Sequence, residues 1–203
     1  MNSDTYRTIV SPAKGLYKEK GSRFLSLAVP VSGPDEIKPI IDKLRKEHHE
    51  ARHHCYAYML GYERLVWRTN DDGEPSGTAG RPILGQINSF GLTNIAIIVS
   101  RYFGGTLLGV SGLINAYRTA AANAIENSGQ IEKTVQDYYE VTYPYISMND
   151  VMKILKEESL GQSDQSFNME CRLRLNFRVS AREKVIPRLS RIDGLTLKFI
   201  ETK

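Results

Sequence analysis

The sequence of 203 residues has few cysteines and lacks long apolar runs. Its two cysteines, Cys55 and Cys171, stand far apart and outside any motif, which argues against a disulfide scaffold and favours a reducing compartment. The longest apolar run, Ile95–Val99, is much too short to cross a bilayer. The first ten residues carry charges where a signal peptide would be apolar. We therefore expect a cytoplasmic protein that has no membrane-spanning segment.

The chain also lacks blocks of like charge. Lysine and arginine number 27 against 23 acidic residues, so the formal net charge is +4. This balance is compatible with an anionic partner, but it is weaker than that of a dedicated nucleic-acid-binding arm. Hydrophobic residues make up 41% and charged residues 25%, as is usual for globular proteins, so a core can form without a disulfide or a metal.

The first 130 residues alternate between strand and helix patterns. Two short strands are predicted on either side of Gly21, between residues 16 and 31. A helix that Ser32 is expected to cap, and that contains Pro39, should follow and run to about His49. Residues 70–80 are rich in Asp, Gly, Pro, Ser and Thr and are predicted to form a loop. Further strands are expected at 54–60, 65–69 and 93–100, and further helices at 82–91 and 110–127.

The last third of the chain has its own pattern, after a polar stretch at 130–136 that is predicted to be a connector. Strand and helix patterns follow in the order βαββαβ, which is typical of a ferredoxin-like domain. They cover 138–145, 148–158, 160–167, 169–179, 181–192 and 195–200. Alternation in the fourth segment should place Cys171, Leu173, Leu175 and Phe177 on one face and Arg172, Arg174 and Arg178 on the other. We therefore predict an α+β fold of two domains, 1–132 and 137–203.

A glycine-rich corner follows the strand predicted at 93–100. Helix N-termini leave N–H groups free, glycines let an anion approach the backbone, and an arginine can form two bonds to a phosphate or carboxylate. Aromatic residues here could stack on a base or pack beneath the loop. An anion site and a plain tight turn fit this spacing about equally well. The candidate binding residues in this corner are Arg101, Tyr102, Phe103, Gly104, Gly105 and Gly109.

The loop at 70–80 contributes three acidic candidates, which are Asp71, Asp72 and Glu74. Such carboxylates can bind a hard cation, but their spacing is not that of an EF-hand. Loop structure through Asx turns, or an ion pair with Arg101 or Arg81, therefore ranks ahead of a metal site. Ser76 and Thr78 could cap the helix that begins near Ala79.

The adjacent His53 and His54 should point to opposite faces of their strand, so they cannot readily chelate one ion together. His54 remains a candidate polar contact of the site, beside the plainer interpretation of a structural histidine. Cys55 has no helix N-terminus nearby that would activate it as a nucleophile. The sequence has no triad order, nucleophile elbow or complete Walker loop, so we predict neither catalytic residues nor a cofactor.

Three motifs together resemble the YigZ/IMPACT family, in its bacterial YigZ branch. They are the run DDGEPSGTAGRPI from Asp71 to Ile83, the run SRYFGGTLLG from Ser100 to Gly109, and the segment Gly112–Tyr117. The resemblance implies a first domain folded like the second domain of small-subunit ribosomal protein five. It also implies a tail that resembles a late domain of elongation factor G. Eukaryotic members of the family act in translational control by binding a partner in the amino-acid starvation pathway.

Three functions follow from these observations. The favoured one is a non-enzymatic cytosolic binding protein linked to the regulation of translation, with RNA or a ribosome-associated protein as its partner. The alternative is a phosphate- or nucleotide-dependent small-molecule enzyme that uses the acidic loop and the Gly104–Gly112 turn. The third is an interaction module whose second domain presents an arginine-bearing sheet face. The sequence leaves the oligomeric state open.

Overall fold

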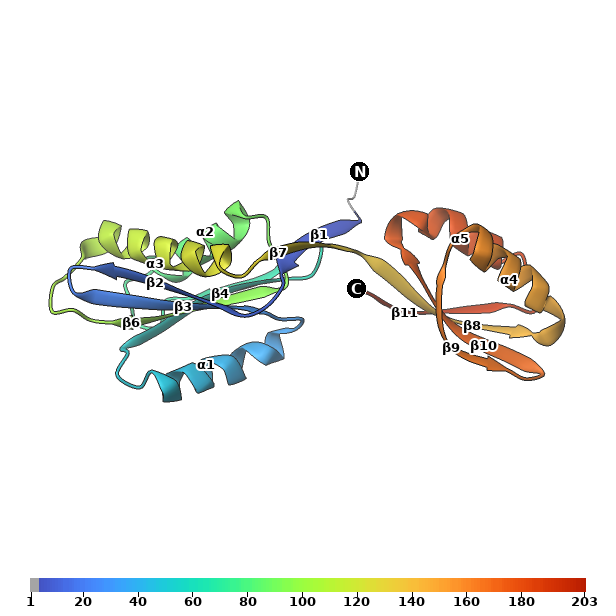
Figure 1. The fold of residues 1–203 in the computed structure, drawn as a ribbon, viewed down its shortest axis with the longest axis horizontal. Coiled ribbons are helices and arrows are strands. Elements are labelled where there is room, and N and C mark those ends of the chain that lie inside the picture. The colour runs from blue at the N-terminus through green and yellow to red at the C-terminus, as the bar shows by residue number, and fades with distance from the viewer. Residues whose placement is uncertain (1–3) are drawn as a thin grey trace. The chain divides into compact units, whose positions relative to one another are not determined.

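The computed structural model describes residues 4–203, and the chain divides into two compact units (Figure 1). One unit comprises Tyr6–Lys133, and the other comprises Thr134–Lys203 together with Asp4 and Thr5. We call them the first and the second domain. Both combine helices with antiparallel sheet, so the predicted α+β class is confirmed.

The first domain is a five-stranded antiparallel sheet in the order β2-β3-β6-β4-β5, with helices on both faces. Helices α2 and α3 cover one face and α1 covers the other (Figure 1). The strands are β2 (Ala13–Glu19), β3 (Ser22–Pro30), β4 (His53–Leu60), β5 (Val66–Asn70) and β6 (Ile95–Tyr102). The helices are α1 (Ile37–Glu47), α2 (Gly80–Ser89) and α3 (Gly109–Glu126).

The central strand β6 is buried along almost its whole length because both of its faces are covered. Ile97 and Val99 enter the core beneath α2 and α3, whereas Ala96 and Ile98 enter the core beneath α1. Strict alternation along β6 therefore decides on which side of the sheet each later residue of the strand lies.

Two predicted helix starts are corrected by the structure. Before α1, a 3-10 turn (Pro34–Glu36) intervenes, and the Glu36 carboxylate accepts hydrogen bonds from the backbone N–H groups of Ser32 and Gly33 at 2.9 and 3.0 Å. Ser32 is thus not the cap, and Pro39 lies in the first turn of α1, where its missing N–H costs nothing. At α2, neither Ser76 nor Thr78 acts as the cap, a role that a carboxylate of the preceding loop takes instead.

The stretch predicted as a connector is partly a strand. Residues Gln130–Thr134 form β7, which pairs with β1 (Thr5–Ile9) in a two-stranded sheet. The Val10 N–H also donates to the Gly129 carbonyl at 3.2 Å. The prediction failed because the strand is short, polar and mostly exposed, and its partner lies at the other end of the sequence.

The second domain follows the predicted βαββαβ order. Its antiparallel sheet has the order β11-β8-β10-β9, and α4 and α5 cover one face. The elements are β8 (Gln136–Pro144), α4 (Met148–Glu157), β9 (Gly161–Phe167), β10 (Glu170–Arg178), α5 (Arg182–Leu189) and β11 (Thr196–Thr202), with 3-10 turns at Tyr145–Ser147 and Val179–Ala181. Along β10, Cys171, Leu173, Leu175 and Phe177 are buried and Arg172, Arg174 and Arg178 are exposed, as the alternation predicts.

Candidate functional site

The end of β6 separates two neighbouring candidates. Arg101 continues the series of Ile97 and Val99 and points to the face of α2 and α3. Tyr102 lies on the α1 side, where its hydroxyl is 2.9 Å from His48 Nδ1 and its ring lies under the Arg23 guanidinium, 4.6 Å away. Tyr102 therefore helps to hold α1 rather than joining Arg101 in one site.

Arg101 forms a buried ion pair with the acidic loop. Its Nη1 donates to Glu74 Oε1 at 2.6 Å, and both side chains are almost fully buried. The Tyr117 hydroxyl of α3 donates to the same carboxylate oxygen at 2.8 Å. The Arg101 guanidinium also lies 5.4 Å from the Phe24 ring centre and 5.7 Å from that of Phe103. The ion pair considered from the sequence thus joins the loop, β6 and α3 at one point.

Not all of the Arg101 guanidinium is satisfied. Nη1 donates to Glu74, whereas Nε is buried and has no hydrogen-bond partner within residues 4–203. Buried donors are nearly always paired, so an unpaired donor on an arginine that borders an open cavity makes this arginine a candidate for ligand binding.

Asp71 and Asp72 shape the loop that carries Glu74. The Asp71 carboxylate accepts hydrogen bonds from the backbone N–H groups of Gly77, Ala79 and Gly80 at 2.8, 3.0 and 2.7 Å, and so caps α2. The Asp72 carboxylate accepts from His54 N and from Arg45 Nη2, each at 2.7 Å. Their carboxylates have separate partners from that of Glu74, and the predicted structural role of the loop acids describes both.

His54 is a structural residue on the α1 side of the sheet. Its ring is buried, and Nδ1 lies 2.9 Å from Ser100 Oγ. Burial lowers the pKa of the His54 imidazole, with the Asp72 charge partly opposing this shift. Its neighbour His53 points to the opposite face, where Nδ1 donates to the Asp72 carbonyl oxygen at 2.7 Å. The predicted opposite facing of the two histidines is confirmed, and His53, not His54, borders the cavity described below.

The glycine corner has a packing role and a role at a helix start. Gly104 lies against the β2–β3 turn so closely that an added Cβ would be 1.9 Å from Gly21 C, and its N–H donates to Ser22 Oγ at 3.1 Å. Gly105 and Gly109 have φ values of +87° and +71°, which glycine adopts without strain. Gly109 begins α3, whose N-terminus has no side-chain cap.

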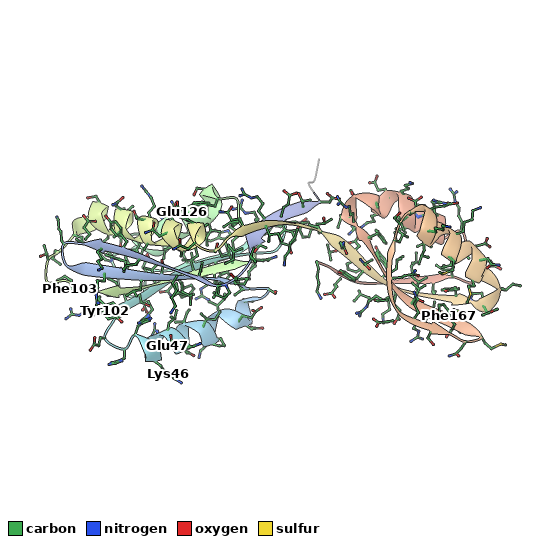
Figure 2. The ribbon with its side chains drawn as sticks, viewed as in Figure 1. Lys46, Glu47, Tyr102, Phe103, Glu126 and Phe167 are labelled. Atoms are coloured by element: carbon green, nitrogen blue, oxygen red, sulfur yellow. The ribbon has the colours of Figure 1, made fainter. Side chains whose placement is uncertain are left out.

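An open cavity of about 360 Å³ lies above the Arg101–Glu74 pair. Of the ten candidate residues, four border it, namely Glu74, Arg101, Phe103 and Gly109. The others are Arg52, His53, Pro75, Leu107, Leu108, Val110 and Leu113. Figure 2 shows Phe103 with Tyr102 at one end of the first domain, away from Glu126 at the end of α3. The aliphatic border was not predicted from the sequence, although the paired Leu107 and Leu108 in a glycine-rich turn are a signal that could have indicated it.

Comparison with known proteins identifies the family of this chain. Residues 20–125, just over half of the chain, match the Impact N-terminal domain. The chain belongs to the IMPACT family. It is 35% identical to IMPACT family member YvyE of Bacillus subtilis over 73% of this chain and 70% of that protein, and 34% identical to IMPACT family member YigZ of Escherichia coli over 76% and 74%. A crystal structure of a hypothetical protein superposes with a TM-score of 0.71 at 28% identity, covering 98% of both chains.

The segment that carries the IMPACT signature contains every residue that borders the cavity. Beneath the cavity, Cys55 Sγ lies 3.3 Å from the Tyr117 hydroxyl and 3.0 Å from the Asp71 carbonyl oxygen. Burial raises the pKa of both the Cys55 thiol and the Tyr117 phenol well above their ordinary values. Both groups are therefore protonated at neutral pH, and Tyr117 is committed to Glu74 as a donor.

Two features are absent from residues 4–203. No cluster of three His, Cys, Asp or Glu side chains is arranged to hold a metal ion. None of the helices in this part of the chain is both long and apolar enough to pass through a bilayer.

Proposed function

We propose that this IMPACT-family protein is a cytoplasmic, non-enzymatic binding protein that acts in the regulation of translation, and that the cavity above Arg101 is its partner-binding surface. The observation that carries the proposal is the combination of a fixed arginine with an unpaired donor and an exposed aliphatic border around the same cavity. Exposed apolar groups around a few fixed polar groups are typical of binding sites.

The state of the reactive groups supports binding rather than catalysis. A general base must be free to accept a proton from a substrate, but the Glu74 carboxylate accepts from Arg101 and Tyr117 and is almost fully buried. A nucleophilic cysteine needs a lowered pKa, whereas burial raises that of Cys55.

The enzyme alternative draws less support from the geometry. It requires Asp71, Asp72 and Glu74 to act together on a phosphate or a metal, but their carboxylates are engaged by the α2 backbone, by Arg45 and His54, and by Arg101, respectively. Stabilisation of the protein by one nucleotide in a thermal-shift screen, lost in Asp72→Ala, would revive this alternative.

The link to translation rests on the family. The resemblance implies translational control for the eukaryotic members, and it also implies that both domains are folded like parts of the translation apparatus. The partner is accordingly RNA, a ribosome or a ribosome-associated protein. An RNA partner held by phosphate contacts would be released steeply as salt rises, whereas a protein held by apolar contacts would not.

A pair of leucine variants tests the proposal. Leu107 borders the cavity and is 82% exposed, while Leu65 lies in the β4–β5 connection and is 75% exposed, so aspartate should leave the fold intact at either position. Ribosome co-sedimentation and affinity capture from the protein's own cytoplasm should detect the partner with the wild type and Leu65→Asp, and lose at least tenfold with Leu107→Asp.

Two results would contradict the proposal. Equal binding by both leucine variants would remove the cavity from partner binding. Absence of the wild type from ribosomal fractions at low salt, together with capture of no component of the translation apparatus, would remove the link to translation.

A further inference from the structure

The charges around the cavity add up to roughly one positive charge. Glu74 neutralises Arg101 by their ion pair. Arg52 is exposed, and within residues 4–203 it has no ion-pair partner; its guanidinium lies 5.6 Å from the Phe103 ring centre. The Arg52 N–H donates to the Arg101 carbonyl at 3.1 Å, which fixes the two arginines as neighbours.

The start of α3 adds to this positive end. The first N–H groups of a helix have no partner within it and carry a partial positive charge. Gly109 and Val110, the first residues of α3, both border the cavity, and no side chain caps this N-terminus. Arg101, whose Nε has no hydrogen-bond partner within residues 4–203, borders the same cavity.

Four aliphatic side chains also border the cavity. Leu107, Leu108, Val110 and Leu113 border the cavity, and Leu107 and Val110 are 82% and 60% exposed. These side chains suit a branched aliphatic group rather than a nucleobase, since the phenyl ring on the border, that of Phe103, already lies near two guanidinium groups. A volume of about 360 Å³ is at the low end of ligand sites, which span roughly 300–1,000 Å³.

We propose that this cavity binds the C-terminal residue of a partner protein, with its carboxylate held by Arg52, Arg101 and the start of α3 and an aliphatic side chain held by the leucines. A carboxylate carries the single negative charge that the site can balance, whereas a phosphate monoester carries nearly two. Capture of a chain terminus by backbone N–H groups is a known mode of peptide recognition. This inference rests on the proposed function, because it names the chemistry of the partner.

N-acetyl-leucine is a probe of this chemistry, because it has a free carboxylate and one aliphatic side chain. Titration of the isotope-labelled full chain, followed by amide NMR shifts, should show binding with a Kd on the order of 1 mM. The shifts should centre on Arg52, Gly109 and Val110. N-acetyl-leucinamide, which lacks the charge, should bind about tenfold more weakly.

Two variants and one control make the test specific. Arg52→Ala and Leu107→Asp change exposed side chains, and both should weaken N-acetyl-leucine about tenfold while the remaining amide spectrum is unchanged. Arg172→Ala removes an exposed arginine of the second domain and should have no effect.

Equal binding of the leucinamide would overturn the inference, and so would tighter binding of inorganic phosphate or uridine monophosphate. Failure of the two proposals can be told apart. If Leu107→Asp abolishes partner capture while N-acetyl-leucine does not bind, the proposed function survives and the inference fails. If N-acetyl-leucine binds as expected but no translation component is captured, the inference survives and the role in translation fails.

Discussion

Removal of the charge on Glu74 should weaken the first domain strongly. In Glu74→Gln the side chain can still accept a hydrogen bond from Tyr117. The Arg101 guanidinium, however, is left as an uncompensated charge in a residue that is only 6% exposed. Breaking a buried pair in this way costs about 3–5 kcal/mol of unfolding free energy, out of a total of roughly 5–15 kcal/mol. With a urea dependence of about 2 kcal/mol per M, the unfolding midpoint should fall by roughly 2 M.

Urea unfolding can be followed in the first domain by tryptophan fluorescence, because the one tryptophan of the chain, Trp67, lies in β5. Asp42→Asn is the matched control: it also converts an acid to an amide, but it breaks the exposed pair with Lys38 and should cost less than about 1 kcal/mol. The double variant Glu74→Gln with Arg101→Met should show a favourable coupling of about 1–3 kcal/mol. A cost for Glu74→Gln no larger than that of Asp42→Asn would refute the reasoning.

Two further predictions concern packing and pH. Gly104→Ala should destabilise the first domain by about 3 kcal/mol or more in the same urea assay, because its Cβ would overlap backbone atoms. Gly85 lies in open space inside α2, so Gly85→Ala should stabilise the domain by about 0.5–1 kcal/mol, and equal effects of the two substitutions would contradict this account. Since burial lowers the folded-state pKa of His54 below its ordinary value of 6.5, the unfolded chain takes up the proton first, and stability should fall as pH drops below about 6.5. His54→Gln should remove up to about 2 kcal/mol of that loss at pH 5, and the exposed His49→Gln should not; a wild-type stability that is flat from pH 7 to pH 5 would argue against it.

Much of the fold could be predicted from local patterns, because they coincide with tertiary burial here. The β-branched run at Ile95–Val99 is a buried central strand, and the alternation around Cys171 and Leu173 gives the faces of β10 correctly. Strand β7 could not be predicted, since its polar residues are ordered by pairing with β1, more than a hundred positions away in the chain.

The site was predicted less well than the fold, and for a physical reason. Residues that are adjacent in a motif need not share a site, because alternation sends Arg101 to the cavity and Tyr102 to the opposite face of the sheet. The same rule separates His53 from His54. The capping of α2 by Asp71 could not be predicted from the sequence, because the carboxylate accepts hydrogen bonds from N–H groups up to nine residues ahead along an irregular loop.

The position of β2 limits how short a folded fragment of this protein can be. The family signature covers residues 20–125 and so begins after β2 has ended at Glu19. Yet β2 pairs with β3 along its whole length, and at Gly15 it approaches α3 so closely that a Cβ would be 2.6 Å from Ala124 N. A fragment cut at the signature would leave β3 as an unpaired sheet edge and would expose the inner side of α3. Such a fragment should aggregate. The smallest piece that stays soluble by itself should therefore start before Ala13.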